Sequence, residues 1–155
     1  MSELSRARVL PWTKGVRLVA CDVNGLMAVE KSAGVLSHPN RKSDFGKALL
    51  EADYDDKKQA YRIEREEDGP GWVYLLNRLD SATSGLVLLT TNAFVRTEVL
   101  KAFEKKQVRK VYAALVFGFT RKGPPVWKDR LTIKKAQGGL RVSEGSGLSA
   151  ETRLV

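Results

Sequence analysis

Several kinds of residue are scarce in this sequence, and each scarcity excludes a class of protein. Cys21 is the only cysteine of the 155 residues, so an internal disulfide framework is excluded, and with His38 as the only histidine we expect no metal site. The longest apolar runs, at residues 85–89 and 111–117, fall far short of the roughly 20 residues of a membrane-spanning helix. Because no apolar stretch long enough for a secretory signal follows the basic N-terminus, we expect a cytoplasmic protein.

The bulk composition is that of an ordinary globular chain. Hydrophobic residues make up 43% and charged residues 29% of the sequence, and the length lies inside the usual range for one domain of roughly 100 to 200 residues. One domain is therefore expected. A chain of this size buries only about two thirds of its unfolded surface, so each strand carries a large share of the core.

The net charge of +9 is concentrated in one segment. Residues 96–135 contain 12 Lys and Arg against 3 acidic residues, whereas the rest of the chain contains 15 of each and cancels. Such local positive density attracts a polyanion through counterion release and long-range steering. A solvated helix face with scattered loop lysines explains the same charge equally well.

Hydrophobic patterns predict a chain of short strands with one clear helix. Asn24-Gly25 between apolar runs predicts a β-hairpin over residues 16–30, since a type I′ turn needs positive φ at its central residues. Asn92 is the expected N-cap of a helix that ends near residue 107. Further strands are expected at residues 72–76, 85–91, 110–118, 130–134, 140–143 and 150–155, a short helix at 44–52, a loop at 32–40, a surface excursion at 53–71 and a tail at 1–15.

Most ionisable residues give no sign of chemistry. His38 precedes Pro39 in a turn-like stretch, and with no second histidine we expect a surface or turn-stabilising role for it. Arg78 and Asp80 are different because they share a short loop between two apolar strands, where catalytic groups concentrate. From the residues alone, an ordinary salt bridge between Arg78 and Asp80 is the favoured alternative.

Three motifs, in the same order, resemble those of the RluA-like pseudouridine synthases. The run Asn-Arg-Leu-Asp-Ser-Ala-Thr-Ser-Gly-Leu at residues 77–86 is similar to the family's His-Arg-Leu-Asp-x-x-Thr-Ser-Gly-Leu, with Asn77 in place of the usual histidine. Residues 34–39 resemble its Gly-x-x-x-His-Pro stretch. Residues 110–118 resemble its Lys-x-Tyr-x-Ala-x-Val-x-Gly strand. The resemblance covers residues 16–155, preceded by the expected tail of residues 1–15.

This resemblance implies a fold, a reaction and a set of site residues. The implied fold is α+β, with a mixed, mainly antiparallel sheet and flanking helices. Asp80 would be the catalytic carboxylate that allows a uridine base to detach, rotate and reattach through carbon. Tyr112 would be the second catalytic residue, which stacks on the flipped base and could assist proton transfer. Arg78 would hold the distorted RNA, and Thr83, Ser84 and Lys110 would bind substrate. The implied partner is ribosomal or transfer RNA, with no cofactor, metal or membrane, and we expect a monomer.

One motif of the family is not found in the sequence. In the family, the strand that resembles residues 149–155 continues into Gly-Arg-x-His-Gln-x-Arg, whose basic residue pairs with the catalytic aspartate. We therefore expect an incomplete catalytic domain. Two hypotheses stay open, namely an RNA uridine isomerase and an inactive RNA-binding remnant of that family.

Overall fold

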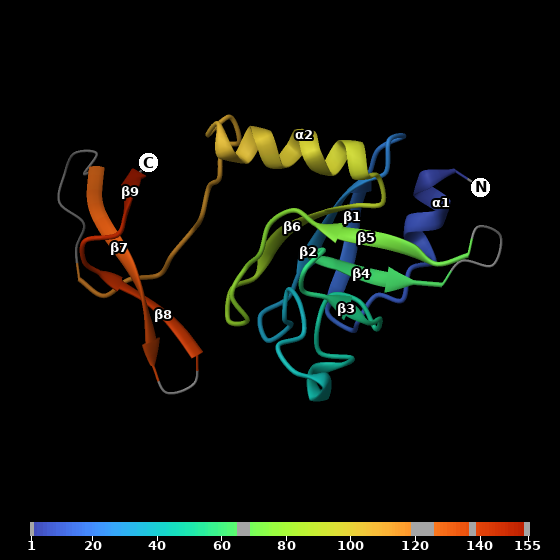
Figure 1. Cartoon of the computed structure of the whole chain (residues 1–155), viewed down its shortest axis with the longest axis horizontal. Helices are drawn as coiled ribbons and strands as arrows, with labels where there is room; N and C mark the ends of the chain where they lie inside the picture. The colour runs from blue at the N-terminus through green and yellow to red at the C-terminus, as the bar shows by residue number, and fades with distance from the viewer. Residues whose placement is uncertain (1, 65–68, 119–125, 137–138, 154–155) are drawn as a thin grey trace. The chain divides into compact units, whose positions relative to one another are not determined.

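The computed structural model describes residues 2–64, 69–118, 126–136 and 139–153 and divides into two compact units (Figure 1). Unit 1 is Met1–Lys110 and unit 2 is Val111–Val155. The elements of unit 1 are α1 (Glu3–Arg8), β1 (Val16–Cys21), β2 (Leu26–Lys31), the 3-10 helix η1 (Lys42–Asp44), β3 (Tyr54–Asp55), β4 (Ala60–Ile63), β5 (Gly71–Leu75), β6 (Gly85–Thr90) and α2 (Ala93–Glu104). Unit 2 contains β7 (Val126–Ala136), β8 (Gly139–Glu144) and β9 (Leu148–Arg153).

Unit 1 is built on one six-stranded sheet with the order β1-β2-β6-β5-β4-β3. Every pair of neighbouring strands in it is antiparallel. The predicted hairpin of residues 16–30 is confirmed, but its turn is not the expected type I′, because Gly25 takes a positive φ and Asn24 does not. The Asp22 carboxylate accepts the backbone N–H groups of Asn24 and Leu26, and Gly25 has a φ of 80°, a conformation that glycine adopts without a steric cost. The β2–β6 register then places β6 in the middle of the sheet.

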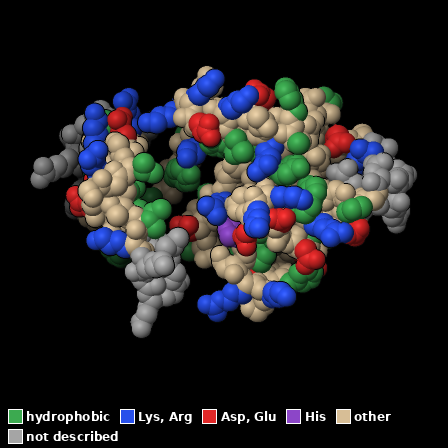
Figure 2. Space-filling model, in the orientation of Figure 1, with side chains coloured by type: hydrophobic (Ala, Val, Ile, Leu, Met, Phe, Trp, Pro, Cys, Tyr) green, Lys and Arg blue, Asp and Glu red, His purple; other side chains and the backbone are tan. Residues whose placement is uncertain are grey.

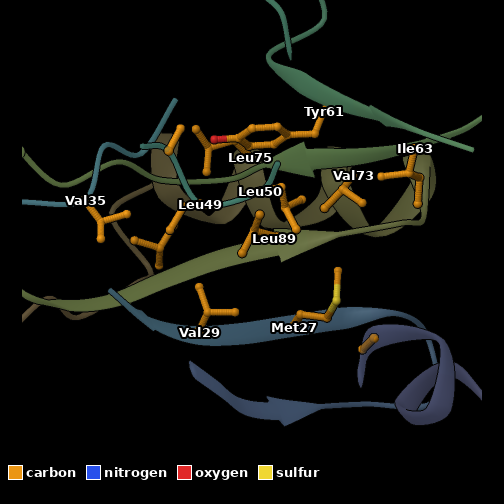
Figure 3. Packing of buried hydrophobic residues seen from close by; sticks show 13 residues of the cluster. Met27, Val29, Val35, Leu49, Leu50, Tyr61, Ile63, Val73, Leu75 and Leu89 are labelled. Carbon is orange, nitrogen blue, oxygen red and sulfur yellow. The ribbon is translucent and has the colours of Figure 1, made fainter. Parts of the chain in front are cut away.

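The core of unit 1 lies on one face of this sheet (Figure 3). Alternate residues of the central strands point to it and are fully buried, namely Met27 and Val29 of β2, Val87 and Leu89 of β6, Val73 and Leu75 of β5 and Tyr61 and Ile63 of β4. Residues from the segment between β2 and β3, among them Leu49 and Leu50, cover this face. A helix was expected at residues 44–52, and that prediction is wrong. Gly46 takes a φ of 77°, and the chain runs on extended so that Ala48 and Leu50 pair with Leu36 and Trp12.

Two further expectations for unit 1 are corrected. The charged stretch 53–71, expected as a surface excursion, contributes β3, β4 and the start of β5, because Tyr61 and Ile63 pack into the core between charged neighbours. The first 15 residues, expected as a tail, form α1, and Trp12 then pairs with Leu50 in the segment that covers the core face of the sheet. Ala7 and Thr13 are buried, and the Trp12 indole N–H donates to the Ala7 carbonyl.

The helix predicted for residues 92–107 is confirmed as α2. The Asn92 side chain caps it by accepting the backbone N–H groups of Phe94 and Val95. The expected strand at residues 110–118 is wrong. The described part of the chain provides no partner strand for it, and Leu115 and Phe117 are fully exposed. A strand needs such a partner to satisfy its backbone polar groups.

Unit 2 is a small sheet with the order β8-β7-β9, again antiparallel. It confirms the strands expected near residues 130–134 and 140–143, with longer bounds, and the strand expected at 150–155 as far as Arg153, since residues 154–155 lie outside the described residues. The chain is thus of the α+β class with antiparallel sheets. None of the helices in the described ranges is long and apolar enough to cross a membrane.

Candidate functional site

Asp80 lies in the loop of residues 77–84 that joins the neighbouring central strands β5 and β6. Its carboxylate side chain is exposed, and its backbone carbonyl accepts the N–H of Thr83 at 3.0 Å, which closes a turn. Among the described residues, neither Asp80 nor Arg78 has an oppositely charged group within ion-pair distance. The salt bridge between them that the sequence favoured is therefore not present.

Side chains on both sides hold the backbone of this loop. The buried Ser37 hydroxyl accepts the N–H of Leu79 at 3.0 Å and donates to its carbonyl at 2.8 Å. Asn77, at the position where the family motif has histidine, accepts the N–H of Leu88 at 2.6 Å and donates to the carbonyl of Leu86 at 3.3 Å. An amide suits this position because it offers one acceptor and two donors. Asn77 therefore fixes the two ends of the loop to each other.

Lys31 is a buried cation beneath the loop, and no sequence pattern pointed to it. It is the last residue of β2, points to the core face and is 0% exposed. Its ammonium donates to the carbonyls of Val35 at 2.7 Å, Ser32 at 3.1 Å and Ser81 at 3.3 Å. Burial lowers the pKa of this ammonium, while the nearby Asp80 carboxylate acts in the opposite direction. Lys31 is therefore both a tie to the loop and a positive charge close to Asp80.

His38 positions Arg78, a role that sequence reasoning missed although the residue stood in a recognised motif. The Arg78 guanidinium lies 3.1 Å from His38 Nε2, and His38 Nδ1 lies 3.2 Å from the Pro39 carbonyl. Because a carbonyl only accepts and a guanidinium only donates, both contacts require the neutral imidazole with its proton on Nδ1. The Pro39 contact agrees with the expected turn-stabilising role, and the Arg78 contact adds to it.

Two tyrosines connect this pair to the core. The His38 ring stacks on Tyr54 with centroids 5.1 Å apart, and Tyr54 meets the edge of the buried Tyr61 at 4.9 Å. The Tyr61 hydroxyl donates to the carbonyl of Ser37 at 2.7 Å. Burial raises the pKa of Tyr54 to about 12, so this phenol stays protonated at neutral pH. Packing in the core thus determines where the guanidinium of Arg78 lies.

The other predicted site residues are divided between the loop and the segment that follows α2. Thr83 is half-buried and Ser84 is exposed, and both belong to the Asp80 loop. Lys110 is the last residue of unit 1, with its ammonium 5.9 Å from the centre of the Phe103 ring. Tyr112 belongs to unit 2 and is 64% exposed. The structure thus brings Arg78, Asp80, Thr83 and Ser84 together, and the roles of Lys110 and Tyr112 stay predictions.

The loop can do the chemistry of an accessible carboxylate. Asp80 is free to approach a ligand, its backbone is held from three directions, and Arg78 presents a positioned cation two residues away. In the described residues no cluster of His, Cys, Asp or Glu could hold a metal ion. Such a carboxylate can attack an electrophilic carbon or stabilise positive charge that develops there.

Comparison with known proteins gives a family match that contains this loop. Residues 25–150 match the model of a family described as RNA pseudouridylate synthase. A protein of Oryza sativa subsp. japonica named RNA pseudouridine synthase 1 is 38% identical over 74 residues, which cover 48% of this chain and 19% of that protein. An uncharacterised RNA pseudouridine synthase of Chlorobaculum parvum is 33% identical over 96 residues, covering 60% of this chain and 28% of the relative.

A third relative is matched over more of the chain. The dual-specificity RNA pseudouridine synthase RluA of Vibrio parahaemolyticus is 27% identical over 111 residues, covering 70% of this chain and 36% of that protein. The chain thus spans well under two thirds of the length of the curated relatives that it matches.

Proposed function

Because the chain belongs to the RNA pseudouridylate synthase family, we propose that it isomerises uridine to pseudouridine in structured RNA, with Asp80 as the catalytic carboxylate. The observation that carries this proposal is the state of the Asp80 loop. Ser37, Lys31 and Asn77 hold its backbone, while the carboxylate itself is exposed and without an ion-pair partner among the described residues. A fixed backbone with an available carboxylate is the arrangement that catalysis on a bound ligand requires.

The reaction breaks one bond to the ribose and makes another. The bond between C1′ and N1 breaks, the uracil turns, and a bond between C1′ and C5 forms; the proton on C5 is then lost while N1 gains one. Asp80 either adds to the sugar or stabilises the positive charge that develops at C1′. The base must first leave its stack, which costs a few kcal/mol. No cofactor enters this scheme.

The remaining residues receive roles that follow from the family motifs. Arg78, held by His38, would contact the RNA beside the flipped nucleotide. Tyr112 would stack on the base, and Thr83, Ser84 and Lys110 would bind the substrate. Residues 16–155 would form the catalytic domain, and the packing of residues 3–13 onto the core extends the folded part of unit 1 beyond it.

The names of the relatives indicate which kinds of RNA the protein could modify. Relatives are named for dual specificity or for the large ribosomal subunit, the latter in Bacillus subtilis, so we propose ribosomal or transfer RNA as the substrate. We further propose that the protein works as a monomer in the cytoplasm.

RNA binding without isomerisation is the second candidate function. Two observations favour it. Asp80 has no cation at ion-pair distance among the described residues, and Tyr112 lies in a segment that pairs with none of the described strands. A protein that keeps the basic surface but lacks these contacts would bind RNA and leave uridine unchanged.

One experiment separates the two functions. RNA transcribed with uridine tritiated at C5 is incubated with the wild-type chain or with Asp80→Ala, and the tritium released to water is counted. We expect release by the wild type and none by Asp80→Ala, with equal RNA binding by both. RNA binding without release from the folded wild type would establish the second function, and release that persists in Asp80→Ala would refute the role of Asp80.

A further inference from the structure

Two cations of unit 1 lie on aromatic rings of the same strand. The Lys58 ammonium lies 3.8 Å from the centre of the Trp72 ring, and the Arg96 guanidinium lies 4.9 Å from the centre of the Tyr74 ring. Arg96 also donates to the backbone carbonyl of Lys58 at 3.0 Å, so the two cations are neighbours. We call Lys58, Trp72, Tyr74 and Arg96 the basic–aromatic patch.

The patch lies on the face of the sheet opposite the core. Trp72 and Tyr74 alternate along β5 with the buried Val73 and Leu75, and α2 contributes Arg96 from above (Figure 1). Arg62 is directly opposite Trp72 in the β4–β5 register and is exposed, which adds a third cation to this face. Figure 2 shows Lys and Arg side chains interspersed with hydrophobic ones over this part of unit 1.

The bonding capacity of the patch is not used up within the chain. Arg96 Nε is buried and has no hydrogen-bond partner among the described residues, and neither has the hydroxyl of Tyr54. Neither Lys58 nor Arg96 has an acidic side chain within ion-pair distance among the described residues, so both positive charges remain available to an anion.

We propose that the basic–aromatic patch binds the sugar–phosphate backbone of RNA. This inference rests on the proposed function, since it assigns a surface to the same substrate. Phosphate oxygens would accept hydrogen bonds from Lys58 and Arg96, whose positions the rings of Trp72 and Tyr74 fix in advance.

The charge balance favours a polyanion over an acidic protein segment. Glu64 lies 3.5 Å from Arg62 and offsets that third cation, whereas Lys58 and Arg96 have no acidic partner within ion-pair distance among the described residues. Lys58 and Arg96 lie over aromatic rings. Cations beside aromatic rings are typical of surfaces that bind nucleic acids without sequence preference. The patch also differs from the surface expected from the sequence, since Lys58 and Arg62 lie outside the basic segment 96–135.

The test measures the affinity of the whole chain for a fluorescein-labelled RNA stem-loop with uridines in its loop, over a series of KCl concentrations. Lys58→Gln and Arg96→Gln should each weaken binding about five- to tenfold and reduce the salt slope by about 0.7 to 0.9. Arg96→Lys keeps the charge and should restore most of the affinity. Trp72→Leu removes only the ring and should cost about two- to fivefold.

Lys101→Gln is the matched control. Lys101 lies on α2 like Arg96, but Glu98 already neutralises it at 2.8 Å, so the variant should change the affinity less than twofold. Equal losses in Lys101→Gln and Arg96→Gln, with all variants folded by circular dichroism, would show a diffuse charge effect and overturn the patch while the proposed function stands. Absence of RNA binding by the wild type would instead overturn both.

Discussion

Lys31→Met is the sharpest test of how the Asp80 loop is held. The substitution keeps the aliphatic stem but removes the ammonium from the carbonyls of Ser32, Val35 and Ser81. The contacts to Ser32 and Ser81 are only partly buried, so water can replace the donor there, whereas the Val35 carbonyl is buried and loses its partner. A hydrogen bond from a charged donor contributes about 1.5–3 kcal/mol, and removing a buried charge offsets part of any loss. We expect the free energy of unfolding to fall by about 2–3 kcal/mol.

The assay is urea unfolding followed by tryptophan fluorescence in a Trp127→Phe background. Trp12 and Trp72 then report on unit 1 alone, because Trp127 lies in unit 2. Arg17→Met is the control: Arg17 is an exposed cation on β1 paired with Glu30 at 2.6 Å, and its loss should cost less than about 0.5 kcal/mol. If Lys31→Met lowers the free energy of unfolding by a similarly small amount, or raises it, Lys31 does not stabilise the loop.

The same residue gives a dependence of stability on pH with a definite sign. Burial lowers the pKa of Lys31 below its ordinary value of 10.5, so between the two values the unfolded chain binds more protons than the folded one. Stability therefore rises with pH through that window and is independent of Lys31 below it, where both states are protonated. Lys31→Met should lack this rise. An equal rise in wild type and variant would assign it to another group.

Two further predictions concern Arg78 and α2. His38→Phe keeps the stack on Tyr54 but loses the acceptor for Arg78, so RNA affinity measured by fluorescence anisotropy should fall about three- to tenfold, the value of one hydrogen bond, with no further loss on an Arg78→Ala background. If the double variant loses as much additional RNA affinity as His38→Phe loses alone, His38 does not act through Arg78. Asn92→Ala removes the N-cap of α2 and should lower the free energy of unfolding by about 1 kcal/mol, measured by urea denaturation, and no change would contradict the capping contact.

Local sequence signals predicted those elements whose cause is local. The hairpin at Asn24-Gly25 and the capped helix after Asn92 depend on residues close in sequence, and both are confirmed. The expected helix at 44–52 failed because Leu49 and Leu50 take their conformation from the sheet they cover, which no local pattern records. The short strand β4 was hidden in the same way, since charged neighbours surround its buried residues.

The candidate site was predictable only as far as its motifs reach. Arg78, Asp80, Thr83 and Ser84 share one loop because they are consecutive in the chain, and the sequence identified them together. Lys31 and His38 precede their partners in the loop, Ser81 and Arg78, by at least 40 residues in the sequence. Their contacts with the loop therefore come from tertiary packing. An exposed-looking lysine at the end of an apolar strand gave no signal that it would be buried.

The order of strands in unit 1 also has a consequence for how the site forms during folding. The β5–β6 connection that carries Asp80 closes locally, but β2 pairs with β6 across more than 50 residues, as in the partners Met27 and Leu89. Loop-closure entropy makes such distant pairings form late. The chain therefore passes through species in which Asp80 is already in a turn while Lys31 has not yet reached Ser81. In hydrogen exchange, the Thr83 amide, which donates to the nearby Asp80 carbonyl, should then become protected early, whereas the Leu79 amide, which donates to the distant Ser37 hydroxyl, should become protected only as slowly as the β2–β6 ladder.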